Sequence, residues 1–242
     1  MNSQLINGVL INWSRIDEAS YLRNINALSG VEEICFDHSV TFFVGENGSG
    51  KSTLLEAIAV AYGFNPEGGT RNYNFSTYDS HSELCEAITL SRGVRRAAGG
   101  YFLRAESFYN VATKEEEYSR GPGGVPQHFH EKSHGESFLA LVQNNFRPNG
   151  LYLLDEPEAA LSPQRQLTLL VDIHRLANEG AQFIIVTHSP VLLGLPKAQI
   201  LTFDDGPVRP CGYEETDSFQ ITSMFINSRE ALLKRLLDKE II

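Results

Sequence analysis

The sequence predicts an α/β fold with a mostly parallel sheet, in a single domain over residues 1–242. Two observations support this prediction. Short apolar segments typical of buried strands alternate with segments of helical periodicity, an order that favours a parallel sheet covered by helices. A glycine-rich motif also joins one such strand directly to the helix after it. The length of 242 residues suits one domain, or one domain with a small appendage.

The glycine-rich motif is residues 45–52, GENGSGKS, which fits the phosphate-loop pattern G-x-x-x-x-G-K-[ST]. Residues 39–44 before it are predicted as a strand, and residues 53–62 after it as a helix. This geometry directs backbone N–H groups and a helix N-terminus at a phosphate. Lys51 is expected to reach the β- and γ-phosphates and Ser52 to hold Mg²⁺. The predicted nucleotide-binding residues are Gly45, Glu46, Asn47, Gly48, Ser49, Gly50, Lys51, Ser52 and Thr53.

Before and after this motif, the first half of the chain is less regular. Residues 1–44 are predicted as strands and turns, and residues 81–92 as a short strand or helix. Residues 99–108 are predicted as a strand that continues into the start of a helix. Residues 113–132 are polar and are interrupted by glycine and proline, which predicts a loop.

The second half alternates regularly between helices and strands. Helices are expected at residues 136–146, 163–178 and 228–240, and strands at residues 151–155, 183–187 and 200–203. The helix at 163–178 is amphipathic, with Pro163 suited to its first turn and Gly180 just after its end. Ser228 is expected to cap the C-terminal helix.

The composition is that of an ordinary globular protein, with 42% hydrophobic and 21% charged residues. No apolar run reaches the length of a membrane span, and the start lacks the regions of a signal peptide. We therefore expect a cytoplasmic protein without direct membrane insertion.

The formal net charge of −10 does not favour nucleic-acid binding. Cys35, Cys85 and Cys211 show no disulfide or zinc-site spacing.

Two strands of the second half end in residues that can bind a metal ion or take part in a reaction. Residues 151–155 form an apolar strand that carries Asp155 to the sheet edge, where it can hold Mg²⁺ directly or through water. Glu156 follows and can act as the general base on an attacking water. His188 follows the strand at 183–187 and is expected at the same edge, where it can contact a γ-phosphate or the water.

A second anion site is predicted where SHGES, residues 133–137, opens a helix. Ser133 can cap this helix with Glu136, and a helix N-terminus with a glycine amide also binds anions. Because residues 45–52 already provide one phosphate site, this second site is most useful across a dimer. Tyr21, about 24 residues before Gly45, can stack on an adenine ring or pack within a β-layer.

The order of GENGSGKST, SHGES, LYLLDEPEAALSP and THSP resembles the ATP-binding-cassette (ABC) ATPases, over roughly residues 20–205. Within them the chain looks similar to short soluble ATPases near the RecF, OLD and SMC branch. The resemblance implies a P-loop fold with an antiparallel β-layer and a small helical signature subdomain at about residues 107–147. It also implies a head-to-tail homodimer with two ATP molecules between the protomers.

The resemblance assigns roles to named residues. Ser133, Gly135 and Glu136 stand where the family's signature contacts the opposite γ-phosphate. Asp155 matches the metal-binding aspartate, Glu156 the catalytic glutamate and His188 the switch histidine.

This sequence departs from the family pattern in three places. The signature reads SHGES instead of LSGGQ, and Ser162 replaces the usual aspartate after the catalytic glutamate. The expected glutamine after the middle strand is not obvious. Glu106 is the nearest candidate for that metal- or water-facing position, and Arg104 is an alternative structural or phosphate-facing partner. His128, His130 and His134 are better explained as loop histidines than as a metal site.

Three functions follow from these expectations. The first is an Mg²⁺-dependent ATPase that dimerises on ATP and drives or gates an unidentified protein partner. The second is a slow nucleotide-sensing switch that regulates a nuclease, a toxin or a DNA-processing partner. The third is the ATP-binding subunit of a transporter, whose membrane part would be another chain.

Overall fold

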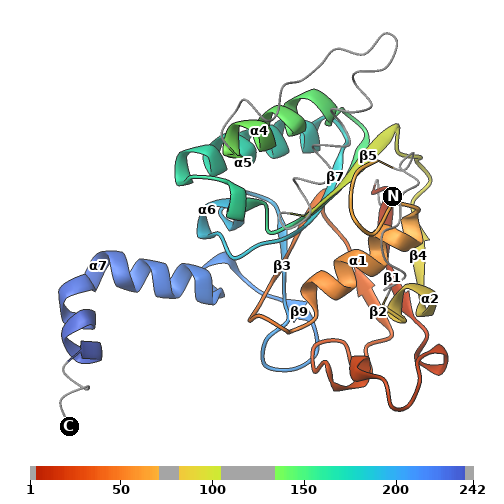
Figure 1. Ribbon diagram of the computed structural model, residues 1–242, viewed down its shortest axis with the longest axis horizontal. Helices are drawn as coiled ribbons and strands as arrows, with labels where there is room; N and C mark the ends of the chain where they lie inside the picture. Colours follow the sequence, from red (N-terminus) through yellow and green to blue (C-terminus); the bar gives the residue numbers. More distant parts are fainter. Residues whose placement is uncertain (1–3, 71–81, 105–133, 238–242) are drawn as a thin grey trace.

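The computed structural model describes residues 4–70, 82–104 and 134–237, and its centre is a six-stranded sheet (Figure 1). The strand order is β5-β6-β7-β3-β8-β9. Neighbouring strands are parallel from β5 to β8, and β9 pairs antiparallel with β8. The strands are β3 (Val40–Val44), β5 (Gly99–Arg104), β6 (Gly150–Asp155), β7 (Gln182–Val186), β8 (Gln199–Thr202) and β9 (Arg209–Pro210). The predicted mostly parallel sheet is confirmed.

A second, antiparallel sheet has the order β2-β1-β4. Its strands are β1 (Ile6–Ile11), β2 (Glu33–Cys35) and β4 (Ile88–Arg92). The buried side chain of Gln182, at the start of β7, joins it to the central sheet. Its carbonyl oxygen accepts from the N–H groups of Leu5 and Ile6, and its amide donates to the Ile6 carbonyl. The antiparallel layer that the family resemblance implied is therefore present.

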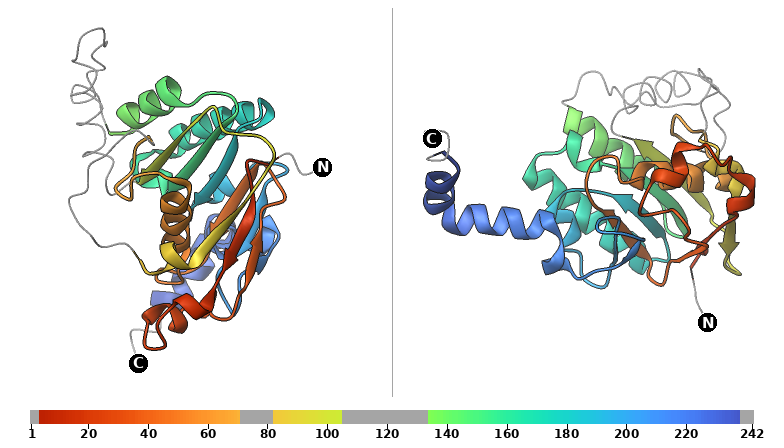
Figure 2. Two further views of the ribbon diagram at one scale, coloured as in Figure 1. Left: turned by 90° about the vertical axis from the view of Figure 1, so that its right-hand side faces the viewer. Right: turned by 90° about the horizontal axis from the view of Figure 1, so that it is seen from below.

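Helices cover both faces of the central sheet (Figures 1 and 2). On one face, α1 (Lys51–Tyr62) lies between the central sheet and the antiparallel sheet, with α2 (Leu84–Ala87) beside it. On the other face lie α4 (His134–Asn145), α5 (Pro163–Asn178) and α6 (Pro190–Leu193). The described residues also include the short 3-10 helices η1 (Trp13–Arg15), η2 (Tyr21–Asn24), η4 (Pro157–Ala160) and η5 (Tyr213–Glu215).

The apolar runs of the central strands are continuous because both faces are covered. Successive side chains of a strand point to opposite faces. Leu151 and Leu153 pack in the core around α1, whereas Tyr152 and Leu154 pack in the core around α4 and α5. A strand buried on both sides needs apolar residues at every position, which explains why these strands were recognisable in the sequence.

The C-terminal helix differs from its prediction. α7 (Asp217–Leu237) begins eleven residues before Ser228, and Ser228 has non-helical angles (φ −136°, ψ 31°) that kink the helix there. The predicted start is thus a kink between two helical halves, the second of which begins where a capped helix was expected. Residues 217–227 were missed because they contain serine, threonine and isoleucine, which are weak helix formers.

Other boundaries differ in smaller ways. Residues 81–92 were predicted as a short strand or helix, and the described part contains both, α2 followed by β4. The helix expected from residue 136 begins at His134. Of the helical region predicted at 107–147, α4 is within the described residues, and residues 107–133 lie outside them.

Candidate functional site

The loop between β3 and α1 has the backbone shape that its glycines permit. Gly48 and Gly50 adopt positive φ angles of 82° and 95°, a region that glycine enters without strain. A Cβ atom on Gly50 would also lie 2.7 Å from Ile25 Cγ2. Gly50 then caps α1, and Lys51 is the first helical residue. The loop therefore ends at a helix N-terminus, an arrangement that binds anions.

Lys51 is buried, with 4% of its surface exposed. Its Nζ donates to the carbonyl oxygens of Gly45 at 2.6 Å and Glu46 at 2.7 Å, so the amine turns back over the loop. Burial lowers the pKa of Lys51, and the nearby carboxylates of Asp204, Glu156 and others oppose this effect. A buried cation held by neutral carbonyls is suited to exchange them for phosphate oxygens.

Ser52 and Asp155 meet although they are 103 residues apart. Ser52 Oγ donates to Asp155 Oδ1 at 2.9 Å, and Asp155, 8% exposed, is the last residue of β6. A hydroxyl and a carboxylate are hard oxygen ligands of the kind that Mg²⁺ binds together with phosphate oxygens and waters. The donor set therefore fits Mg²⁺ bound with a nucleotide.

Arg104 is the cation beside this pair. Its Nη1 lies 2.9 Å from Glu56 Oε2, and its Nε lies 3.6 Å from Asp155 Oδ2. β5 pairs with β6 so that Arg104 is opposite Asp155, which explains the contact. Of the two alternatives for Arg104, the observed contacts are those of an ion-pair partner. Glu106, the candidate for the metal- or water-facing position, lies outside the described residues.

Tyr21 contributes to a cavity next to the loop. The side chain, on η2, is 57% exposed, and its hydroxyl donates to Ser82 Oγ at 3.3 Å. The cavity has a volume of about 500 Å³ and is lined by Tyr21, Ser52, Thr53, Glu56, Ser82, Glu83 and Arg104. Tyr21 is exposed on a 3-10 helix and does not pack within a strand layer, and its stacking on an adenine ring stays a prediction.

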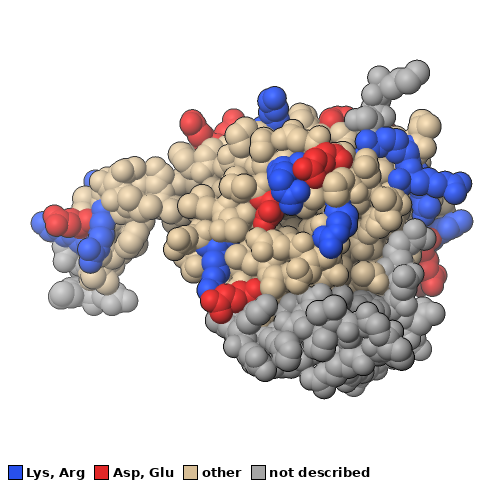
Figure 3. Space-filling view, turned by 90° about the horizontal axis from the view of Figure 1, so that it is seen from above, with Lys and Arg blue, Asp and Glu red and all other residues tan. Residues whose placement is uncertain are grey.

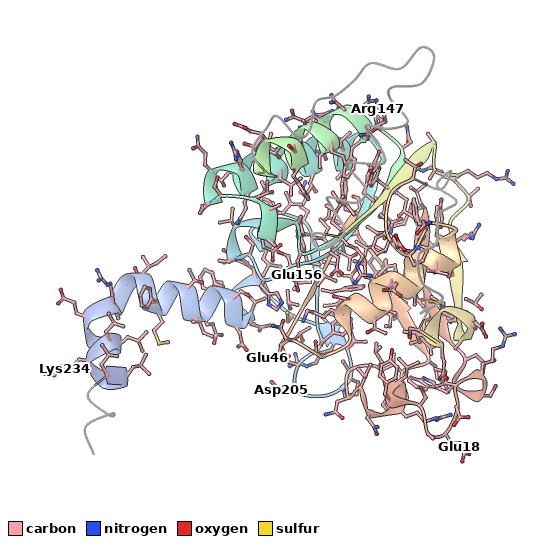
Figure 4. All side chains as sticks on the ribbon, in the orientation of Figure 1. Glu18, Glu46, Arg147, Glu156, Asp205 and Lys234 are labelled. Atoms are coloured by element: carbon pink, nitrogen blue, oxygen red, sulfur yellow. The ribbon has the colours of Figure 1, made fainter. Side chains whose placement is uncertain are left out.

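Glu156 and His188 come together at the end of the sheet. Glu156 directly follows β6, and its φ of 49° is a left-handed conformation that costs a non-glycine residue of order 1–3 kcal/mol. Its Oε1 lies 3.8 Å from His188 Nε2, too far for a hydrogen bond but close enough for an ion pair with a protonated ring. In Figure 4, Glu156 and Glu46 both lie near the middle of the molecule.

Glu158 is a site residue that sequence reasoning missed. Its side chain, on η4, accepts a hydrogen bond from the backbone N–H of His188 at 2.5 Å. Burial raises the pKa of this carboxyl, and the His188 hydrogen bond partly opposes that effect. Glu158 thus ties the turn that carries Glu156 to the turn that carries His188. The sequence DEPE, residues 155–158, shows an additional carboxylate close to Asp155 and Glu156. Nothing in the sequence indicates that this carboxylate lies beside residue 188.

The raised pKa predicts how Glu158 affects stability. Because the folded chain holds the proton more tightly than the unfolded chain, this carboxyl contributes less to stability as the pH rises above about 4.5. Glu158→Gln, which keeps an oxygen acceptor, should therefore gain stability relative to the wild type from pH 5 to pH 8. Thermal unfolding from pH 4 to pH 8 measures this, with the exposed residue in Glu18→Gln as the control. A gap that widens toward pH 4 would contradict it.

Asp204 is a second residue that sequence reasoning missed. Its Oδ1 accepts from the backbone N–H of Glu46 at 2.8 Å, and a Cβ atom added to Gly45 would lie 2.9 Å from the same oxygen. It belongs to a cavity of about 450 Å³ between the phosphate loop and the start of α7, which His188 also lines. Asp204 follows β8, the strand next to β3, so its position depends on strand order.

The signature residues lie on a different part of the chain. Gly135 is buried against α5, where a Cβ atom would lie 2.8 Å from Arg165 Nη1. Glu136 Oε1 accepts from Arg165 Nη2 at 2.9 Å. In Figure 1, α4 lies over α5 and apart from the start of α1. Ser133, His128 and His130 lie outside the described residues.

Two family models match parts of the chain. Residues 21–119 match a model described as an AAA domain. Residues 135–194 match a model described as "AAA domain, putative AbiEii toxin, Type IV TA system". The first range contains the phosphate loop, and the second contains Asp155, Glu156 and His188.

Relatives of known name match more of the chain. The thiamine import ATP-binding protein ThiQ of Haemophilus influenzae is 28% identical over 78% of this chain and 96% of its own length. ThiQ of Cereibacter sphaeroides is 33% identical over 61% of this chain and 69% of its own length. The chain belongs to the ABC-type ATPases. The family resemblance inferred from the four motifs is confirmed at this level.

Solved structures are also similar to this ABC-type ATPase. The SMC head domain from Thermotoga maritima is 18% identical, with a TM-score of 0.43 over 74% of this chain and 93% of that one. Among the described residues, no helix is both long enough and apolar enough to cross a membrane.

Proposed function

We propose that this ATPase uses Mg²⁺, closes as a pair of identical chains around ATP, and through that closure drives or gates a protein partner. The contact between Ser52 and Asp155 carries the proposal, because it joins the phosphate-loop helix to a carboxylate at the end of β6. A loop that binds phosphate alone would need no such carboxylate. The pair matches what a nucleotide-bound magnesium ion requires.

Each residue has a distinct part in the proposed reaction. The N–H groups at the start of α1 and the Lys51 amine hold the β- and γ-phosphates. Ser52 and Asp155 hold Mg²⁺, which when bound offsets negative charge on these phosphates. The Glu156 carboxylate accepts a proton from the attacking water as the water adds to the γ-phosphorus and the bond to ADP breaks. His188, 3.8 Å from Glu156, contacts the γ-phosphate or the water.

The separation of α4 from α1 supports a paired arrangement. Gly135 and Glu136 begin a 12-residue helix whose N-terminus is suited to an anion. Within one chain α4 lies over α5, and the phosphate loop is elsewhere (Figure 1). The second copy would bring Ser133, Gly135 and Glu136 to the γ-phosphate bound by the first.

Mg²⁺ removal and Asp155→Asn test the metal site. Chelation of Mg²⁺ should abolish ATP hydrolysis, and Asp155→Asn should lower the rate at least about 100-fold, because a neutral amide is a weaker ligand for a hard dication. Phosphate release at several Mg²⁺ concentrations measures both effects. Asp37→Asn, at an exposed position, is the control. Wild-type rates in Asp155→Asn would exclude the proposed ligand.

The named relatives favour one further candidate, the ATP-binding subunit of an importer. ThiQ is named for thiamine import, and a matched protein of Aliivibrio fischeri is named a hemin import ATP-binding protein. In that case a membrane protein should co-purify with this chain from native cells. If none does, and turnover without a partner is negligible while ATP binds tightly, the nucleotide-sensing switch becomes the better account.

A further inference from the structure

α7 extends away from the body of the molecule (Figures 1 and 2). None of its 21 residues is buried. At about 1.5 Å per residue the helix is about 30 Å long. Most helices in proteins are stabilised by packing an apolar face, and α7 contacts the body near its start, where the ring centroids of Phe219 and Tyr213 lie 4.8 Å apart. Its exposed large apolar side chains are Ile221, Met224, Phe225, Ile226, Leu236 and Leu237, each between 42% and 72% exposed.

The half of α7 nearest the body has apolar residues on two sides. Phe219 and Ile226, one face of the helix, line a cavity of about 330 Å³ with Pro190, Val191 and Tyr213. Ile221, Met224 and Phe225 lie at other positions around the helix. A helix that is apolar around much of its circumference is normally covered on more than one side. The chain therefore carries both an apolar helix and an apolar cavity at its base.

Charge is distributed unevenly along α7. Residues 218–228 contain no charged side chain, whereas residues 229–235 contain Arg229, Lys234 and Arg235 against Glu230. Figure 3 shows this pattern, with blue and red atoms gathered toward the far end of the helix. The chain as a whole has a formal net charge of −10. The far end of α7 is thus a basic segment on an acidic protein.

The base of α7 lies at the candidate nucleotide site. Ile221 and Thr222 line the same cavity as Gly45, Glu46 and His188. Carboxylates of Glu46, Asp204, Asp205, Glu215 and Asp217 line this cavity together with Arg209. A partner that meets this face therefore meets α7 and an acidic surface together.

We infer that α7 binds a second copy of this chain, and that this pairing does not require a nucleotide. A twofold interface needs both complementary surfaces on the same molecule. The chain has two such pairs of surfaces. The apolar half of α7 can pack on the apolar cavity of about 330 Å³, and the basic end of α7 can lie over the carboxylates that line the cavity of about 450 Å³. In the pair, the apolar residues at 221–226 are buried between chains, and each basic end lies over carboxylates of the other copy.

Light scattering of the full chain without nucleotide tests this inference. The wild type should have twice the mass of one chain, and the double variant Met224→Glu, Phe225→Glu should weaken pairing at least about tenfold. Leu167→Glu, Val171→Glu is the matched control, because these residues are 55% and 62% exposed on α5. Lys234→Glu, Arg235→Glu provides a second test that leaves the apolar residues in place, and it should also weaken pairing.

Three results would overturn the inference. The wild type could stay monomeric at every concentration, or the Met224→Glu, Phe225→Glu variant could pair as well as the wild type. Alternatively, α7 could bind vesicles that contain anionic lipid while the chain stays monomeric, which would make it a membrane-binding helix. The ATP-driven closure is tested separately: if Glu156→Gln pairs only with ATP, that proposal stands and this one fails.

Discussion

Glu156→Gln should lower the rate of ATP hydrolysis by about 10²–10⁴-fold, the contribution typical of a general base. Glutamine has nearly the same shape but cannot accept a proton from water. Glu156 takes part neither in the hydrogen bonds of Lys51 nor in the hydrogen bond between Ser52 and Asp155. The affinity for ATP should therefore stay within a few-fold of the wild type. ATP bound in the closed pair should then persist.

Two measurements on this variant separate the reaction from the closure. Phosphate release gives the rate of hydrolysis, and light scattering with and without ATP and Mg²⁺, in a chain that also carries Met224→Glu, Phe225→Glu, gives the mass due to closure alone. Glu32→Gln, on an exposed stretch before β2, is the control for loss of one carboxylate. A rate near that of the wild type would show that Glu156 is not the base. A variant that remains monomeric with ATP at all concentrations would refute closure around the nucleotide.

Lys51→Met should weaken ATP binding by about 10- to 100-fold, because hydrogen bonds to charged groups contribute about 1.5–3 kcal/mol. Methionine has a similar length and no charge. The Lys51 amine donates to the backbone carbonyls of Gly45 and Glu46, and the carboxylates of Asp204 and Glu156 lie near enough to raise its pKa. The expected loss is one of nucleotide affinity, because methionine cannot donate to phosphate oxygens.

Thermal unfolding with and without ATP·Mg²⁺ measures this loss. At 100 times its dissociation constant ATP stabilises the wild type by about 2.7 kcal/mol, whereas 100-fold weaker binding leaves about 0.4 kcal/mol at the same concentration. Lys197→Met, an exposed substitution of the same type, should keep the full shift. An equal shift in Lys51→Met would show that the amine does not hold the phosphates.

The sequence by itself determined the fold class and the local parts of the site. β3, the phosphate loop and α1 are contiguous, so a strand, glycines and a helix start were sufficient to predict them. Asp155 was predictable because both faces of β6 are buried, which leaves an apolar run ending in a carboxylate. These features lie within single segments of the chain, and the pattern of apolar residues along a segment indicates them directly.

Only the tertiary structure decided which distant residues meet. Arg104 reaches Asp155 because β5 pairs with β6 in one register, and Asp204 reaches the phosphate loop because β8 lies next to β3. Glu158 meets the His188 backbone because β6 lies next to β7. The exposure of α7 is also a tertiary property, since its apolar residues look like core residues in the sequence. Pairing register and burial depend on contacts between segments, which the spacing of residues within one segment does not specify.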